Sequence, residues 1–244
     1  MKKILLGIAL SVVALQGCKK DGDDEEEVVV LTIEEQNAYD DAAATNFLDS
    51  HYFDNKGLIV AFDDKVDTDD NNPKLSSYSP VKLPSGVIYI VRPGAQPNPG
   101  KELATTDVLS FMQVTKSYIS AKVNEKIIFA SSNVFSNNIE GSGVPTGDPA
   151  YYYVKNSVLK NYNTTYNTTH GRSFYEIEGL QEALKSFKAF DLENSADYNM
   201  QGVIIVPSRA AYARDANVFN YTNRSFVFNF QLYKAKTRNM ETED

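Results

Sequence analysis

The sequence predicts an α+β fold built mainly from antiparallel strands. Fifteen Tyr, thirteen Phe and no Trp among 244 residues are typical of a β-rich chain with aromatic packing. Short apolar runs bounded by Pro- and Gly-containing turns recur from residue 84 onward, as expected for strands. Helical spacing of apolar residues appears in residues 33–50 and 177–187. We therefore expect a β-rich α+β chain, with a small helical region before the strands.

Residues 1–17 have the pattern of a secretory signal. Lys2 and Lys3 precede an apolar run that is too short to cross a bilayer, which needs about 20 apolar residues. The run ends in Leu15-Gln16-Gly17-Cys18, which resembles a bacterial lipobox. That resemblance implies that Cys18 is lipidated and anchors the protein to a membrane. The alternative is a signal peptide with an incidental cysteine. In either case Cys18 is the only cysteine, so no disulfide is expected.

Residues 18–32 are expected to form an acidic, solvated tether. The run Asp21-Gly22-Asp23-Asp24-Glu25-Glu26-Glu27 cannot bury apolar surface. A lysine and an acidic cluster just after the lipid-bearing cysteine resemble the export signal of surface lipoproteins in the Bacteroidetes. We therefore expect a cell-envelope protein of the outer membrane. Surface display and a periplasm-facing anchor both remain open.

Charge and length limit the partners and the number of domains. The net charge is −8 and the sequence pI is about 4.9, which gives no attraction to phosphate backbones, so nucleic acid is not expected as a partner. About 210 residues follow the tether, enough for one large domain or two small ones. We divide them into a helical region at 33–83 and a larger domain at 84–238.

The helical region begins with a clear start signal. Thr32-Ile33-Glu34-Glu35 forms a capping box, with Thr32 at the N-cap and Glu35 three residues later. A helix is expected to follow over residues 33–50. Residues 57–62 then have strand character, and the acidic, turn-rich residues 63–73 are expected to form a loop.

The larger domain begins with two strands separated by a turn. Residues 85–91, Ser-Gly-Val-Ile-Tyr-Ile-Val, have strand character. Residues 92–100 contain three prolines and two glycines and are expected to form a turn. Residues 106–111 begin the next strand, and residues 127–132 are expected to form another. We expect residues 133–172, which are rich in Tyr, Asn and Thr, to be an insertion between two strands. The insertion is either a functional or disordered loop or a hairpin extension that packs on the domain.

The order of segments in the C-terminal half resembles the FKBP-type peptidyl-prolyl isomerases. The segments are SFYEIEGLQEALKSF from Ser173, MQGVIIVPSRAAYARDANVF from Met200 and RSFVFNFQLYKAK from Arg224. Residues 86–112 resemble the opening strands of that family, and residues 129–132 resemble its Phe-Asp-Ser-Ser segment. The resemblance covers residues 86–236 and rests on order and spacing. It implies a twisted antiparallel sheet wrapped around a short helix at residues 177–187. It also implies a pocket that binds the proline ring and favours the twisted amide over the planar one.

The resemblance assigns catalytic roles to three residues. Tyr212, in Ala211-Tyr212-Ala213, matches a tyrosine whose hydroxyl donates to the substrate. Ile177 matches an isoleucine whose backbone N–H donates to the carbonyl of the ligand. Phe129 matches an aromatic side wall. The remaining pocket positions are Phe111, which lacks the family's hydroxyl, Ala130, which lacks its aspartate, and Leu180, Phe219 and Phe228.

Several alternatives stay open for these residues. Each of the aromatic residues has an ordinary place in a core, and the spacing of Ile177, Leu180 and Leu184 would bury one helix face in any case. Asn220-Tyr221-Thr222-Asn223 lacks the prolines that the family has in this turn. Tyr212, in a loop after Pro207, is harder to explain by packing alone.

Other chemistries have weak support in the sequence. His51 and His170 are the only histidines, and no HExxH zinc motif occurs. Residues 67–71 have Asp-x-Asp-x-Asn spacing but lack the glycine and the closing glutamate of a calcium loop. We expect no metal and no cofactor.

The sequence leaves three functions open. The first is a lipid-anchored prolyl isomerase or chaperone of exported proteins, with proline-containing polypeptides as clients and weakened catalysis. The second is a binding protein that keeps the fold without catalysis. The third is a surface adhesin or glycan-capture module that uses the Tyr-rich insertion.

Overall fold

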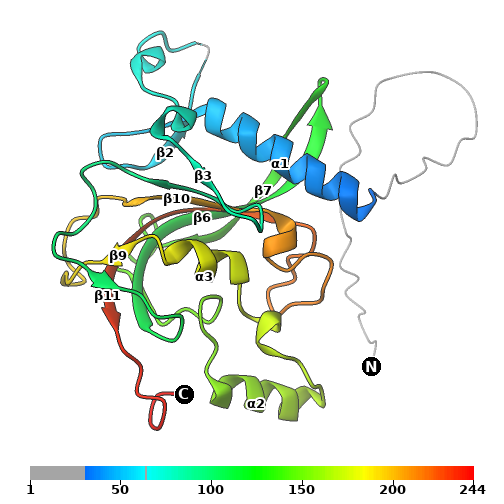
Figure 1. Ribbon diagram of the computed structural model, residues 1–244, viewed down its shortest axis with the longest axis vertical. Helices are drawn as coiled ribbons and strands as arrows, with labels where there is room; N and C mark the ends of the chain where they lie inside the picture. The colour runs from blue at the N-terminus through cyan, green and yellow to red at the C-terminus, as the bar shows by residue number, and fades with distance from the viewer. Residues whose placement is uncertain (1–30, 64) are drawn as a thin grey trace, which may run out of the picture. The chain divides into compact units, whose positions relative to one another are not determined.

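An antiparallel sheet organises the part of the chain that the computed structural model describes, residues 31–63 and 65–244 (Figure 1). Within these residues, seven strands form the main sheet. Their order is β3 (Val81–Lys82), β4 (Ile88–Val91), β10 (Gly202–Val206), β11 (Ser225–Lys236), β6 (Val108–Val123) and β7 (Lys126–Asn137), with β8 (Thr146–Gly147) paired to β6. The predicted mixture of helices with an antiparallel sheet is confirmed.

Alternation along the strands gives the sheet two buried faces. In β10, Ile204 and Val206 join one hydrophobic cluster while Val203 and Ile205 join another, because successive side chains of a strand point to opposite sides. Helix α3 (Glu178–Leu184) packs on the first face through Leu180. Helix α1 (Ile33–Asp49) covers the second. Figure 1 shows the two helices on opposite sides of the strands.

Helix α1 begins and ends close to where the sequence predicts. Thr32 Oγ1 accepts from the Glu35 N–H at 3.1 Å, and Glu35 Oε2 accepts from the Thr32 N–H at 2.8 Å, so the capping box is present. The helix ends at Asp49, where Ser50 leaves helical geometry. Phe47 and Leu48 pack on the sheet.

A buried carboxylate joins α1 to the sheet. Asp40 is fully buried. Its Oδ1 accepts from Ser120 Oγ of β6 at 2.6 Å, and its Oδ2 accepts from the backbone N–H of Ser208 at 2.9 Å. Ser208 Oγ also donates to it, at 2.5 Å. A buried charge is tolerated when several donors satisfy it in this way.

Asp40→Ala is expected to lower the free energy of unfolding by roughly 3 kcal/mol, because each buried donor left without an acceptor costs about 1–3 kcal/mol. Asp49→Ala, at the exposed end of the same helix, is the matched control and should change stability little. Urea denaturation of both variants measures the difference. Equal losses would show that Asp40 is not the link between helix and sheet.

The shorter elements complete the fold. Strands β1 (His51–Phe53) and β2 (Ile59–Ala61) pair with each other, as do β5 (Lys101–Glu102) and β9 (Lys188–Ala189). The predicted strand at 57–62 therefore exists but is shorter. Four short 3₁₀ segments occur within the described residues: η1 (Asp69–Asn71), η2 (Leu75–Tyr78), η3 (Arg172–Phe174) and η4 (Ser208–Ala210).

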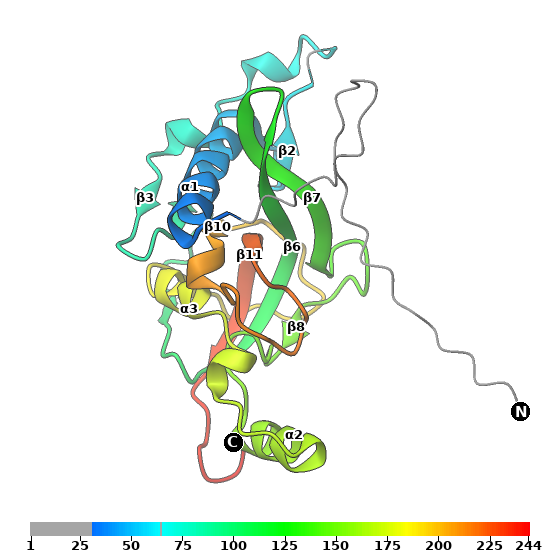
Figure 2. The same cartoon turned by 90° about the vertical axis from the view of Figure 1, so that its right-hand side faces the viewer.

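Residues 133–172, expected to be either a loop or a hairpin extension that packs on the domain, contain more regular structure than a loop. Strand β7 continues to Asn137, and helix α2 (Asn156–Tyr166) occupies part of the remainder. Residues 151–154 between these elements are buried. Figure 2 shows the β6–β7 hairpin as a tall arch beside α1, with α2 near the C-terminus. The segment therefore combines a buried part at residues 151–154 with a helix, α2, that has no buried residue.

The membrane anchor expected at Cys18 lies outside the described residues, as does most of the acidic tether. No helix in the part of the chain that the structure describes combines the length and the apolar character needed to cross a membrane.

Candidate functional site

Most of the pocket residues expected from sequence gather on the face of the sheet that α3 covers. Phe111 comes from β6, Phe228 from β11, and Ile177 and Leu180 from the start of α3; each is at most 1% exposed. Tyr212 follows η4 and joins the same cluster. Phe219 packs against the cluster and is half-buried, with its ring centroid 6.1 Å from that of Tyr212.

Phe129 and Ala130 do not belong to this group, which corrects the sequence assignment. Phe129 pairs with Ser120 and faces α1, where its ring centroid lies 5.8 Å from that of Phe47. Ala130 pairs with Ile119. Ile119 is eight residues beyond Phe111 on β6, or about 26 Å at the usual strand rise. Neither residue can line a site that contains Phe111.

The cause of this error is the register of the β6–β7 hairpin. The strands turn through Asn124 and Glu125, both with positive φ, which is the geometry of a two-residue type I′ turn. Counting outward from that turn places Phe129 only four residues along β7, near the turn and far from Phe111. Phe135 lies closer to the site. Its ring meets Phe226 and Tyr151 edge-on, at centroid distances of 5.1 Å in both cases.

Phe135 is therefore the aromatic wall that sequence reasoning missed. It is followed by Ser136 and Asn137, so the aromatic-then-small-polar pattern used to choose residues 129–132 occurs again six residues later. The signal in the sequence that could have distinguished Phe129 from Phe135 is the Asn124-Glu125 turn, because a turn there fixes the register of the hairpin.

Tyr151 occupies the site. The backbone N–H of Ile177 donates to the Tyr151 carbonyl at 2.8 Å. This N–H is the donor that the resemblance assigns to the carbonyl of the ligand. The Tyr151 ring packs against Phe135 and Phe228, and Gln113 Nε2 donates to its hydroxyl. Burial raises the pKa of the Tyr151 hydroxyl, so it stays protonated at pH 7.

The second expected donor also has an internal partner. The Tyr212 hydroxyl donates to the backbone carbonyl of Tyr175 at 2.7 Å. Burial is the main cause that raises its pKa above the ordinary value. Both polar groups that would hold a substrate are thus bonded within the chain.

The segment around Tyr151 is fixed on both sides. Gln181 Nε2 donates to the Tyr152 carbonyl, and the Tyr152 hydroxyl donates to Ala104 O at 2.8 Å. The N–H of Val154 donates to Glu176 Oε1 at 2.8 Å. Arg172 pairs with the same carboxylate at 2.9 Å. These hydrogen bonds hold residues 151–154 in place. The Ile177 N–H and the Tyr212 hydroxyl are therefore both bonded within the chain and are not free to bind a substrate.

The three consecutive tyrosines of the Tyr-rich segment do not form an exposed platform. Tyr151, Tyr152 and Tyr153 are each at most 8% exposed, whereas Tyr166 on α2 is 63% exposed. Among residues 31–63 and 65–244, no group of three or more His, Cys, Asp and Glu side chains is arranged to hold a metal ion.

Comparison with known proteins gives only distant structural likeness. No protein-family model and no curated protein sequence matches the chain. Among solved structures, FkpA from Escherichia coli is similar with a TM-score of 0.35 and 18% identity. The match covers 65% of this chain and 52% of that one, so it spans about half of FkpA. A peptidyl-prolyl cis-trans isomerase from Pseudomonas syringae is similar with a TM-score of 0.33 and 13% identity, over 64% of this chain and 80% of that one.

Proposed function

We propose that this chain is a lipid-anchored, FKBP-type protein of the cell envelope that binds polypeptide clients, and that its own Tyr151 closes the prolyl-isomerase pocket. The hydrogen bond from the Ile177 N–H to the Tyr151 carbonyl, 2.8 Å long, carries this proposal. It satisfies the donor on which a substrate carbonyl would depend.

Two observations support the FKBP-type assignment in this proposal: the order of the segments along the chain, and the residues that these segments bring into one cluster. A short helix packs on an antiparallel sheet through Leu180, as the resemblance implies. Tyr212 and Phe228 lie in the same cluster although they come from separate segments. Phe135 packs against this cluster, whereas Phe129 packs against the cluster on the opposite face, so Phe135 is the better candidate for the aromatic wall.

Closure of the pocket has a direct consequence for catalysis. The barrier to prolyl isomerisation is about 18–20 kcal/mol and arises from resonance in the peptide bond. A catalyst lowers it by binding the twisted amide more tightly than the planar one. Among the described residues, the two donors that the resemblance assigns to the substrate, the Ile177 N–H and the Tyr212 hydroxyl, both have internal acceptors, so neither is free for that task.

A protease-coupled assay with a proline-containing peptide tests the proposal. We expect no catalysis above the uncatalysed rate for the wild type, at a concentration at which the Pseudomonas syringae isomerase is active. Tyr151→Ala removes the ring but keeps the backbone carbonyl that accepts from the Ile177 N–H, so it should remain inactive as well. Tyr151→Phe keeps the ring and should stay inactive. Wild-type activity equal to that of the Pseudomonas enzyme would contradict the closed pocket.

The anchor is part of the same proposal. We expect Cys18→Ala to release an unlipidated form into the soluble fraction, whereas the wild type stays with the membrane. Metabolic labelling with a fatty acid and fractionation of outer and inner membranes measure both effects. If the wild-type protein carries no label, the proposed lipid anchor is wrong. The proposal of a closed pocket does not depend on that result.

A further inference from the structure

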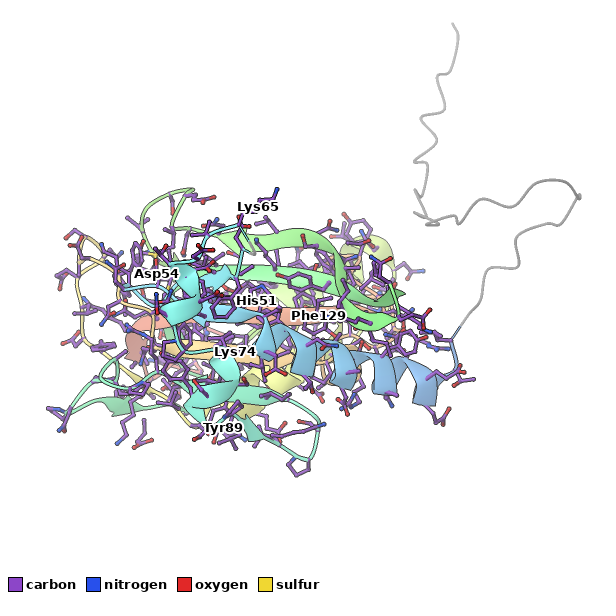
Figure 3. All side chains as sticks on the ribbon, turned by 90° about the horizontal axis from the view of Figure 1, so that it is seen from above. His51, Asp54, Lys65, Lys74, Tyr89 and Phe129 are labelled. Atoms are coloured by element: carbon purple, nitrogen blue, oxygen red, sulfur yellow. The ribbon has the colours of Figure 1, made fainter. Side chains whose placement is uncertain are left out.

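A cleft lies on the face of the sheet that α1 covers, near the end of that helix. It has a volume of about 450 Å³, within the range of roughly 300–1,000 Å³ that is usual for ligand sites. Val114, Tyr118 and Val227 line its sheet side, and Phe47 and His51 line the helix side. His51 and Phe129 lie close together in Figure 3, with Asp54 further along the same segment of chain.

One wall of the cleft is a strand with an open edge. In the β1–β2 pair, the Phe62 N–H donates to Ser50 O and the Asp54 N–H donates to Leu58 O. Because bonded and non-bonded pairs alternate in antiparallel strands, Ile59 and Ala61 direct their N–H and C=O groups away from β1. The Ile59 N–H donates to Asn229 Oδ1 at 3.2 Å. The Ala61 N–H has no acceptor among the described residues.

The floor of the cleft carries an unpaired cation. Lys116 is exposed and pairs across the sheet with Val227 and Val134, and it forms no ion pair with any described residue. Val134 is 59% exposed, so the apolar surface beside Lys116 is open to solvent.

The other ionisable groups of the cleft have internal roles. Asp54 Oδ1 accepts from the backbone N–H groups of Lys56 and Leu58, and Glu140 Oε2 accepts from Asn137 Nδ2. Burial is the main cause that lowers the pKa of His51, so its imidazole is neutral at pH 7. Burial raises the pKa of Tyr118 to about 12, so its phenol is a neutral donor. Among the charged groups that line the cleft, Lys116 is the one whose side chain has neither a hydrogen bond nor an ion pair to a described residue, whereas Asp54 and Glu140 accept hydrogen bonds.

We propose that this cleft binds an extended polypeptide segment as a third strand beside β1–β2, with an acidic side chain of the segment paired to Lys116. Open strand edges bind extended peptides through main-chain hydrogen bonds, and pockets for alternate side chains give the specificity. Here the Ala61 N–H supplies a main-chain donor, and the surface formed by Val114, Val134 and Tyr118 receives the apolar side chains. The proposal deepens the proposed function, on which it rests, by naming where a client binds.

Fluorescence anisotropy with labelled peptides on the full chain in mild detergent tests this site. The acidic probe is a blocked seven-residue peptide that alternates valine and serine around a central aspartate. The basic probe has lysine at the centre, and a third probe has the acidic sequence with N-methylated backbone amides. We expect the acidic probe to bind at least tenfold more tightly than either of the others.

Lys116→Glu should reverse this order, so that the basic probe binds more tightly than the acidic one. Lys122→Glu changes a lysine on the same strand that already pairs with Glu125 and should leave the order unchanged. Three results would overturn the proposal. The wild type could bind the acidic and basic probes equally, or the two variants could have equal effects. The acidic probe could also fail to bind at 1 mM, which corresponds to a binding free energy weaker than about −4 kcal/mol. The isomerase assay does not involve this cleft, so the two proposals can fail separately.

Discussion

Replacing residues 134–171 with a four-residue turn is expected to abolish cooperative unfolding. From the sequence alone, residues 133–172 are expected to be an insertion between two strands, and the removal of a long surface loop would cost little stability. In the structure, Tyr151, Tyr152 and Val154 are buried, and Asn138 Oδ1 accepts from the backbone N–H of Gln113 in the central sheet at 2.7 Å. Removing a buried large aromatic residue costs about 3–5 kcal/mol, and several such losses exceed a typical total stability of about 5–15 kcal/mol.

Calorimetry and near-ultraviolet circular dichroism measure this effect. The control is a variant that lacks only the exposed turn at residues 140–144, which should keep a single sharp transition. A sharp transition in the large deletion would show that the remaining strands and α3 form a complete core without Tyr151.

Tyr151→Ala is expected to have the largest effect of a single substitution in the site. Its ring lies among Phe135, Phe228 and Gln113, and we expect the free energy of unfolding to fall by about 3–5 kcal/mol. For a chain of this size, that corresponds to a decrease in melting temperature of roughly 6–20 °C. Tyr166→Ala, which truncates a tyrosine that is 63% exposed, should lower the melting temperature little.

The cavity left by Tyr151→Ala should bind a molecule of the same shape, since apolar cavities in proteins accept small aromatic ligands. Added 4-methylphenol is therefore expected to raise the melting temperature of Tyr151→Ala and to leave that of the wild type unchanged. A decrease no larger than that of Tyr166→Ala, or no response to 4-methylphenol, would mean that Tyr151 does not fill a pocket.

The sequence predicts those parts of the fold whose signals are local. The capping box of Thr32 and Glu35 and the apolar face with Phe47 are local features, and α1 begins and ends close to the expected residues. The buried strand β10 is likewise a short apolar run after Gly202. Ile177, Leu180 and Tyr212 come together as expected because they flank elements of the predicted type.

The errors in the site concern contacts between distant segments. Choosing Phe129 over Phe135 required the register of a long hairpin, in which a shift of a few positions moves a side chain to the other face or to the other end. Nothing local distinguishes Tyr151, in a run of three tyrosines, from a surface residue. Its role depends on the meeting of its carbonyl with the Ile177 N–H, 26 positions later in the chain, and a single sequence holds no signal for that meeting.

The hydrogen bond between Ile177 and Tyr151 can be measured directly. In the full chain labelled with ¹⁵N and ¹³C, we expect a scalar coupling from the Ile177 amide nitrogen to the Tyr151 carbonyl carbon, because the two groups share a hydrogen bond of 2.8 Å. We also expect a proline-containing peptide to leave the Ile177 amide resonance in place. An Ile177 amide that lacks this coupling and shifts when the peptide is added would contradict the closed pocket.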